Sequence, residues 1–459
     1  MSINNHSISK LSLFAITWPI FIEVFLQAFM KFTDVFMLSF VSDEAVAAIG
    51  VVNQIMMFTF VLFNFTAMGS GVVVAQFTGA GKGKDVSKTI ANALVINLLF
   101  GFIVSVIVVL FRHQFLSIFN LSPELYAYAD IYMIIVGGTL FTQSMVLTLF
   151  SVMEAKGYTK DVMYVAIGMN VINILGNYLF IFGALGVPQL GVTGVAISTA
   201  VARALAMVAM FFILYRRVEV RIKVKDYLYL QMDYVKKIMK IGIPSAGEHL
   251  SYNTSQIVIT VFITLLGASA LATKVYTQNL MMLMVIFSMA MSKGMQIYIG
   301  QLVGAGRLEE AYRNMYRGLK WALGVAMSVA VILAFSGEYL ITFFTSEIDI
   351  ITVGATLLIF GLILEPGRTS NLVIISALRA SGDAKFPVMM GILSMWGISV
   401  PLAYYLGVHL GYGLFGIWTA LIIDEWVRAI LMHFRWRSKV WQRKSLVRQE
   451  RSEVVQETS

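Results

Sequence analysis

An aspartate inside an apolar stretch is the residue of this sequence best suited to chemistry. Asp34 stands in the segment Lys31-Phe-Thr-Asp-Val-Phe-Met. If that stretch crosses a membrane, the charge costs on the order of 2.5–3.5 kcal/mol on insertion scales, so it normally faces a cavity or a partner. One hypothesis is that the carboxylate lines a cavity and binds a proton or a cation. The alternative is an ion pair with Lys31, which lies one turn earlier on the same helix face.

Soft and polar side chains share the helix face of Asp34. In a helix, Gln27, Met30 and Met37 fall on that face. Methionine is polarizable and repacks around varied apolar ligands, although it is also an ordinary core residue. Together with Asn53 in the next stretch, these residues are our candidates for the lining of a substrate cavity.

Two asparagines in a later apolar stretch are the next candidates. Asn173 and Asn177 lie four residues apart and therefore on one face of a helix. Amide oxygens can bind a cation, and amide N–H groups can hold a carboxylate. Both residues are therefore candidates for binding a cation or a carboxylate, and the family resemblance given below implies that they share an ion-coupling and proton-binding site with Asp34. Hydrogen bonding between helices is the alternative interpretation.

The second half of the chain offers an acid and a base at similar expected depths. Glu248 and Lys293 both fall within apolar stretches. An ion pair between them is feasible, because opposite charges inside a membrane usually pair. The pair is either a second functional site or a structural contact.

A proline precedes Asp34 within the first apolar stretch. Pro19 removes one backbone hydrogen bond and clashes with the preceding turn, so it predicts a kink. The kink is either a hinge that lets the part of the helix carrying Asp34 swing, or a static bend.

Composition indicates a helical membrane protein. Hydrophobic residues make up 58% of the 459 residues and charged residues 13%, and the mean hydropathy is +0.80. A soluble domain carries about 25% charged residues. A transmembrane β-barrel would alternate apolar and polar residues in segments of roughly ten, and this sequence does not. The predicted fold class is therefore an all-α membrane protein.

Twelve apolar stretches are long enough to cross a hydrocarbon core about 30 Å thick. The expected spans are residues 10–39, 44–78, 85–111, 123–153, 160–184, 191–215, 234–266, 269–303, 311–336, 347–378, 385–408 and 413–435. They predict an N-terminal six-helix lobe (1–215), a cytoplasmic linker (216–233), a C-terminal six-helix lobe (234–436) and a basic cytoplasmic tail (437–459).

Lysine and arginine alternate between loops. The loops that follow even-numbered spans are basic, whereas the loops that follow odd-numbered spans are nearly free of these residues, with Arg112 as the exception. Basic loops stay on the cytoplasmic side. We therefore expect a multi-pass protein of the cell (inner or plasma) membrane, with both termini in the cytoplasm.

The second half of the chain repeats the first with an offset of 225 residues. Pro19 recurs as Pro244, and the turn Gln76-x-x-Gly-Ala-Gly81 recurs as Gln301-x-x-Gly-Ala-Gly306. Parallel repeats of this kind relate two lobes by a pseudo-two-fold axis along the membrane normal, as in secondary transporters. At the same offset the three candidates for ion coupling meet apolar residues, namely Ile259, Ile398 and Leu402. We therefore expect the coupling site in the first lobe.

No motif indicates an enzyme. The sequence lacks a phosphate-binding Gly-x-x-x-x-Gly-Lys, its five histidines show no metal-ligand spacing, and it has no cysteine. We expect no cofactor and no bound metal. The glycine turns at 79–81 and 304–306 are expected to be helix stops, since glycine is common just past a helix end. The net charge of +9 follows from the basic loops, so we expect no nucleic-acid partner.

Taken together, these features resemble the multidrug and toxic compound extrusion (MATE) transporters. The resemblance covers residues 11–436. The segments that carry it are Pro19 and Asp34, Ala45-Val-Ala-Ala-Ile-Gly50, Ala75-Gln-Phe-Thr-Gly-Ala-Gly81, Asn173-Ile-Leu-Gly-Asn-Tyr-Leu-Phe-Ile-Phe-Gly183, Gly186-Val-Pro-Gln-Leu-Gly-Val-Thr-Gly194, Gly300-Gln-Leu-Val-Gly-Ala-Gly306 and Ala377-Leu-Arg-Ala-Ser-Gly-Asp383.

The resemblance implies a two-lobed antiporter that exports organic cations in exchange for protons or sodium by alternating access. Asp34 is similar to the family's span-1 acid, Pro19 to its bending proline, and Asn173 to its first polar position in span 5. Some members have aspartate where this chain has Asn177, which leaves Asp34 alone at the first-lobe site. Glu248 resembles the span-7 acid of sodium-driven members.

The coupling ion stays open at this stage, with proton coupling favoured. A hard cation such as sodium wants several oxygen ligands, by analogy with other hard cations, whereas a proton needs one carboxylate. A sodium-coupled drug antiporter and a lipid-linked precursor flippase are the alternatives. The expected partners are small organic cations, protons or sodium, and membrane lipids, and the chain is expected to act as a monomer.

Overall fold

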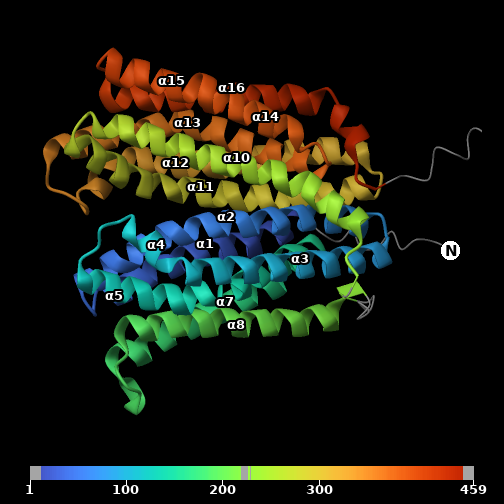
Figure 1. Ribbon diagram of the computed structural model, residues 1–459. Coiled ribbons are helices and arrows are strands. Elements are labelled where there is room, and N and C mark those ends of the chain that lie inside the picture. Colours follow the sequence, from blue (N-terminus) through green and yellow to red (C-terminus); the bar gives the residue numbers. More distant parts are fainter. Residues whose placement is uncertain (1–11, 219–225, 228, 448–459) are drawn as a thin grey trace, which may run out of the picture. The chain divides into compact units, whose positions relative to one another are not determined.

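The computed structural model describes residues 12–218, 226–227 and 229–447. Within these residues the chain is almost entirely helical (Figure 1). The predicted linker (216–233) and the predicted basic tail (437–459) lie partly outside the described residues.

The chain divides into two compact units. The first-half unit is Ile22–Ile243, and the second-half unit is Met1–Phe21 with Pro244–Ser459. The division within helix α1 (Leu13–Leu38) falls just after Pro19, and the division within helix α10 (Met232–Thr264) falls at Pro244. Both helices continue through their proline, so the hinge at Pro19 stays a prediction. The boundaries of the two six-helix lobes also stay a prediction. The two compact units are defined by their contacts, whereas the lobes were predicted from the sequence repeat.

Long helices joined by short turns make up both units. Besides its part of α1, the first-half unit contains α2 (Asp43–Gly79), α3 (Gly83–Leu110), α4 (Arg112–Ser117), α5 (Pro123–Tyr132), the π-helical turn η1 (Met133–Gly137), α6 (Leu140–Ala155), α7 (Thr159–Phe182), η2 (Ala184–Gly186), α8 (Gly191–Arg217) and the start of α10. The second-half unit adds α11 (Ala268–Gly304), α12 (Leu308–Ile341), α13 (Ile348–Ala380), α14 (Lys385–Ser394), η3 (Met395–Ser399), α15 (Val400–Leu402), η4 (Ala403–His409), α16 (Gly413–Arg437) and η5 (Val440–Lys444).

The helices account for the twelve spans expected from the sequence. Among the described residues, nine helices are long and apolar enough to cross a membrane, and the pair formed by α5 with η1 and α6, bent by 48°, gives a tenth. Helices α10 and α16, of 33 and 25 residues, coincide with the two remaining spans but carry more charged side chains. The predicted all-helical membrane fold is thus confirmed.

Glycine turns end α2 and α11 in the same way. Gly81 and Gly306 have φ angles of +69° and +74°, in the left-handed region that glycine adopts without strain. Gly81 N donates to Thr78 O at 3.1 Å, and Gly306 N donates to Val303 O at 3.1 Å. Both turns therefore return the chain at a helix end, and their predicted role as helix stops is confirmed.

Small and polar residues bring α2, α3 and α6 close together in the first-half unit. Asn97 on α3 donates to Phe63 O on α2 at 3.4 Å and to Ser144 O on α6 at 3.3 Å. Gly101, one turn later on α3, leaves no room for a Cβ beside Ser144. Close helix contacts through small residues and side-chain amides are typical of membrane bundles. They fix the frame from which α7 and α8 present their polar side chains.

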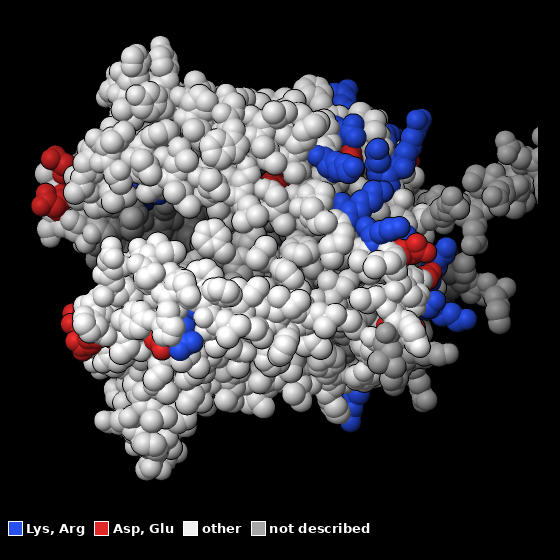
Figure 2. Space-filling model, in the orientation of Figure 1, with Lys and Arg blue, Asp and Glu red and all other residues white. Residues whose placement is uncertain are grey.

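Charged side chains gather at the ends of each unit. On the visible face, Lys and Arg gather mainly at one end, with some Asp and Glu among them, and further Asp and Glu lie at the opposite end, with largely apolar surface between (Figure 2). Arg216 and Arg217 end α8, and Arg435 and Arg437 end α16. This distribution leaves an apolar band that suits a hydrocarbon environment.

Replacement of Gly382 by alanine should destabilise the second-half unit. Gly382 has a φ of +94°, and a Cβ there would overlap the carbonyl oxygen of Lys444. We expect left-handed strain of about 1–2 kcal/mol plus an overpacking cost of about 1–3 kcal/mol. Thermal unfolding of the purified protein in detergent measures the loss.

The matched control is Gly81→Ala, which has the same kind of backbone strain but open space around the new Cβ. Gly382→Ala should lower the unfolding temperature more than Gly81→Ala. Equal effects of the two substitutions would contradict the contact with Lys444.

Candidate functional site

Asp34 lies in a polar cluster within the first-half unit. We call Asp34, Tyr132, Asn173, Asn177, Thr199 and Arg203 the Asp34 cluster; they come from α1, α5, α7 and α8. Asn177 Nδ2 donates to Asp34 Oδ1 at 2.8 Å. Asn177 Nδ2 also lies 3.4 Å from its acceptor Asn173 Oδ1, and Asn173 Nδ2 donates to Thr199 Oγ1 at 3.2 Å. A continuous chain of hydrogen bonds thus runs from the carboxylate to α8.

Helical spacing explains this arrangement. Asn173 and Asn177 are separated by four residues on α7, so their side chains stack on one face. Both are fully buried, with 0% of their surface exposed, whereas Asp34 is partly exposed. Thr199 presents its hydroxyl oxygen to the amides while the hydroxyl donates to Val195 O at 2.9 Å. The amides are therefore held in place, and Asp34 is the one residue of the cluster that is only partly buried.

Two members of the cluster were not among the residues expected from the sequence. Tyr132 lies beside Thr199, and it is close enough to Asp34 and Arg203 to interact with their charges. Arg203 is a charged neighbour of Asp34 and is only 8% exposed. The sequence signal for Arg203 was an arginine inside an apolar span, but its depth and rotation on α8 were not fixed. Tyr132 gave no signal of its own.

The other residues predicted around Asp34 have different surroundings. Gln27 donates to the buried Glu23, and Met37 packs in an apolar core with 8% exposure. Met30 is half-buried and Asn53 is exposed. Among the described residues, no hydrogen bond joins Gln27 or Asn53 to the Asp34 cluster. Their role in a substrate cavity stays a prediction, and the side chain of Lys31, the alternative partner of Asp34, lies outside the description.

Glu248 forms an ion pair with an arginine of α13. Arg379 Nη2 donates to Glu248 Oε2, and Arg379 is 6% exposed. The expected span 347–378 ended just before Arg379, but α13 continues to Ala380 and includes this residue. The expected partner of Glu248 was Lys293, and that pair stays a prediction.

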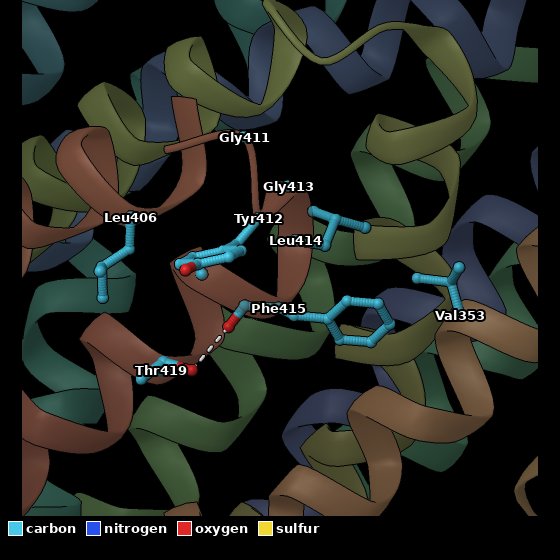
Figure 3. A pocket seen from close by; sticks show the side chains of 9 residues that line it. Val353, Leu406, Gly411, Tyr412, Gly413, Leu414, Phe415 and Thr419 are labelled. Carbon is cyan, nitrogen blue, oxygen red and sulfur yellow. Dashed lines mark hydrogen bonds between the residues drawn. The ribbon is translucent and has the colours of Figure 1, made fainter. Parts of the chain in front are cut away.

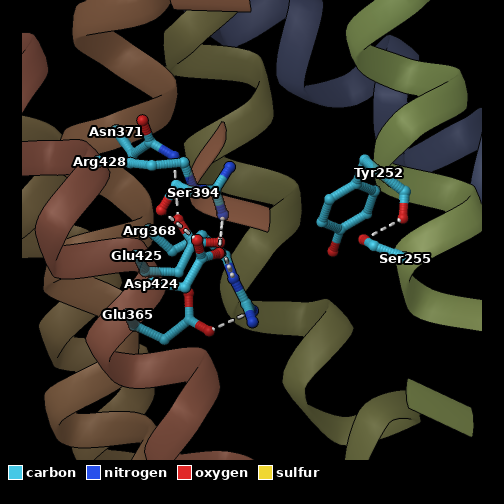
Figure 4. Close-up of polar contacts among 9 residues, drawn as sticks. All are labelled: Tyr252, Ser255, Glu365, Arg368, Asn371, Ser394, Asp424, Glu425 and Arg428. Atoms are coloured by element: carbon cyan, nitrogen blue, oxygen red, sulfur yellow. Dashed lines mark hydrogen bonds and ion pairs between the residues drawn. The ribbon is translucent and has the colours of Figure 1, made fainter. Parts of the chain in front are cut away.

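Helices α13 and α16 share a buried network of charges (Figure 4). Arg428 Nη2 lies 2.8 Å from Asp424 Oδ2 and 3.0 Å from Glu425 Oε1. Arg368 Nη1 lies 2.7 Å from Glu365 Oε1. Each acid thus lies beside an arginine.

Neutral side chains complete the charge network. Asn371 Nδ2 donates to Glu425 Oε2 at 3.0 Å, and Ser394 Oγ donates to Asp424 Oδ1. Figure 4 shows that these contacts join α13, α14 and α16, with Tyr252 on α10 lying apart from them. The network therefore pairs its acids directly with cations and ties three helices together.

An open pocket near the start of α16 is apolar. Figure 3 shows Tyr412, Leu414 and Phe415 with Val353 around it. Thr419 Oγ1 donates to Phe415 O at 2.7 Å, so that hydroxyl is already bonded. The lining includes no acid, lysine or arginine. It offers shape but no group for ion coupling, and the Asp34 cluster remains the candidate site.

Known proteins match almost the whole chain. The sequence pattern of the family described as MatE matches residues 19–179 and 244–405. "Uncharacterized transporter YisQ" of Bacillus subtilis (strain 168) is 45% identical over 95% of this chain and 96% of its own length. "Probable multidrug resistance protein NorM" of Thermotoga maritima is 26% identical over 94% of this chain and 92% of its own.

Solved structures share the fold. One described as "Crystal structure of MATE in the bent conformation" aligns with a TM-score of 0.86 at 18% identity, over 93% of this chain and 94% of that chain. The crystal structure of a mutant of the Vibrio cholerae MATE transporter VcmN aligns with a TM-score of 0.86 at 20% identity, over 94% of this chain and 97% of that chain. These likenesses support the two-lobed helical fold.

Removal of the Arg428 guanidinium should destabilise the protein strongly. Arg428→Met leaves Asp424 and Glu425 buried without their nearest cation, and loss of one partner of a buried pair costs about 3–5 kcal/mol. The control Arg217→Met removes an exposed arginine that lies 3.2 Å from Asp161, with an expected cost of at most about 1 kcal/mol. Denaturant unfolding in detergent compares them, and equal losses would contradict the structural role of Arg428.

Proposed function

The chain belongs to the multidrug and toxic compound extrusion (MATE) family of membrane transporters, and we propose that it is a proton-coupled antiporter that exports organic cations. Asp34 is the group that a proton and a cationic substrate share. The hydrogen bond from Asn177 Nδ2 to Asp34 Oδ1 at 2.8 Å is the observation that carries the proposal. It orients the carboxylate without neutralising its charge.

Asn177 can serve both protonation states of Asp34. Its N–H group donates to the ionised carboxylate, while its own Oδ1 is buried and has no hydrogen-bond partner among the described residues. A protonated Asp34 gains an O–H donor, and rotation of the amide offers it that oxygen. On protonation, Asp34 changes from a charged hydrogen-bond acceptor to a neutral donor, and its hydrogen bond to Asn177 is kept.

Antiport follows from competition at one carboxylate. The ionised form attracts a cationic substrate, and the protonated form does not. A substrate can shift a conformational equilibrium only through different affinities for the two states. Proton binding from the outside would therefore release the substrate and bias α1, with Pro19 as the position where the helix bends.

Several contacts support a proton over sodium as the coupling ion. Asn173 Oδ1 already accepts from Asn177, which leaves the Asp34 carboxylate and the rotatable Asn177 Oδ1 as the free oxygens of these three side chains. Few oxygens are thus left for a hard cation, which normally takes six or more oxygen ligands in the best-known case, that of calcium. Glu248 was the residue that supported sodium coupling in the sequence, and its carboxylate is paired with Arg379.

The charge distribution supports an orientation in the membrane. Basic residues such as Arg216 and Arg437 stand at helix ends that the positive-inside rule assigns to the cytoplasm. We propose both termini there, in the cell membrane, with the chain working as a monomer within its two lobes (1–215 and 234–436).

Asp34→Asn should abolish proton-driven export. An amide can neither release a proton nor attract a cation as a carboxylate does, so we expect the rate of ethidium transport in proteoliposomes to fall at least about tenfold. Asp161→Asn is the control, because Asp161 lies at the start of α7 outside the Asp34 cluster. Normal transport by Asp34→Asn would refute the proposal.

Separate gradients distinguish the coupling ions. Proteoliposomes loaded with ethidium receive either a pH gradient at equal sodium or a sodium gradient at equal pH. The pH gradient alone should drive ethidium movement, since one carboxylate suffices to bind a proton. Transport driven by sodium alone would assign the alternative coupling ion.

A further inference from the structure

Arg203 has a buried guanidinium with unused hydrogen-bond donors. The residue lies on α8 and is 8% exposed. Its Nε and Nη1 atoms are buried and have no hydrogen-bond partner among the described residues. Its recorded ring contact is with Phe60, whose centroid lies 5.8 Å from the guanidinium carbon. A buried charge with open donors is costly, so the arrangement points to a group that uses them.

Arg203 and Asp34 face the same cluster without forming an ion pair. Each is a charged neighbour of the other and of Tyr132. No contact of 4.0 Å or less between their charged groups is recorded within the described part of the chain. The Asp34 carboxylate bonds to Asn177 instead. The cluster thus presents one anionic and one cationic group, separated from each other.

The charge balance of the Asp34 cluster determines which net charge a ligand should carry. With Asp34 ionised, the cluster has no net charge, so a purely cationic ligand would leave a positive charge buried in the unit. A ligand that carries a cation and a carboxylate together keeps the balance and pairs both groups. Guanidinium groups bind carboxylates through two parallel hydrogen bonds.

We propose that Arg203 is a specificity-determining residue that binds the carboxylate of a zwitterionic substrate, while Asp34 binds its cationic group. This inference rests on the proposed function, because it takes the Asp34 cluster as the transport site. Among organic cations it favours those that also carry an acid group, while a plain cation such as ethidium still binds at Asp34 but less tightly. The Phe60 ring adds an apolar face beside the guanidinium.

Two dyes that differ by one methyl ester test the proposal. Rhodamine 110 carries a cationic ring system and a carboxylate, and rhodamine 123 is its methyl ester. Fluorescence anisotropy with the purified full chain in detergent measures the affinity for each dye. The wild type should bind rhodamine 110 at least about tenfold more tightly, the factor expected for one charge-assisted hydrogen-bonded pair.

Arg203→Met should remove this preference and leave the affinity for rhodamine 123 unchanged or higher. Arg203→Lys, which keeps the charge but loses the paired donors, should retain part of the preference, and it serves as the second variant if Arg203→Met does not fold. A wild type that binds the ester more tightly, or a preference that survives Arg203→Met, would overturn the proposal.

Asp34→Asn separates this inference from the function on which it rests. Both dyes carry the cationic group, so this variant should weaken both by similar factors. If Asp34→Asn changes neither affinity while Arg203→Met removes the preference, the proposed role of Asp34 fails and the assignment of Arg203 stands. The reverse pattern refutes Arg203 alone.

Discussion

Ionisable side chains inside a hydrocarbon layer need partners, because an unpartnered charge at the centre of a helix costs about 2.5–3.5 kcal/mol on insertion scales. This constraint organises both units. In the first-half unit, Asp34 is held by the amide of Asn177 at 2.8 Å. In the second-half unit, Arg428 holds Asp424 and Glu425 at 2.8 and 3.0 Å. Helix α16 can therefore carry charges that its composition alone makes unfavourable in a membrane.

The two units stabilise their buried carboxylates in different ways, and this difference helps to distinguish a functional carboxylate from a structural one. A carboxylate paired with an arginine, such as Glu248 with Arg379, has a cationic partner that balances its charge. A carboxylate held by a neutral amide keeps a hydrogen bond in either protonation state. Asp34 is of the second kind. We therefore propose ion coupling in the first-half unit and a structural role for the charge network of α13 and α16.

The sequence predicted the helices and part of the site, because hydropathy and helical spacing are local properties. The same local properties do not predict which helices meet. Long apolar stretches define membrane helices, and spacing by four puts Asn173 and Asn177 on one face. The meeting of these asparagines with Asp34 across helices rested on a family resemblance, since spacing says nothing about neighbours. Arg203 was not predicted as a site residue, because a span boundary that is uncertain by a few residues does not define how deep in the membrane its side chain lies or which way it points from the helix. Arg379 was placed in a loop because α13 extends further than hydropathy indicated.

If a proton and a cationic substrate share Asp34, binding of one displaces the other, and linked binding tests this competition most directly. Calorimetric titration of ethidium into the purified protein, repeated in buffers of different protonation enthalpy, counts the protons released for each cation bound. At a pH low enough to protonate Asp34 in the free protein, the account predicts release of about one proton, lost in Asp34→Asn. Binding of ethidium without proton release by the wild type would contradict it.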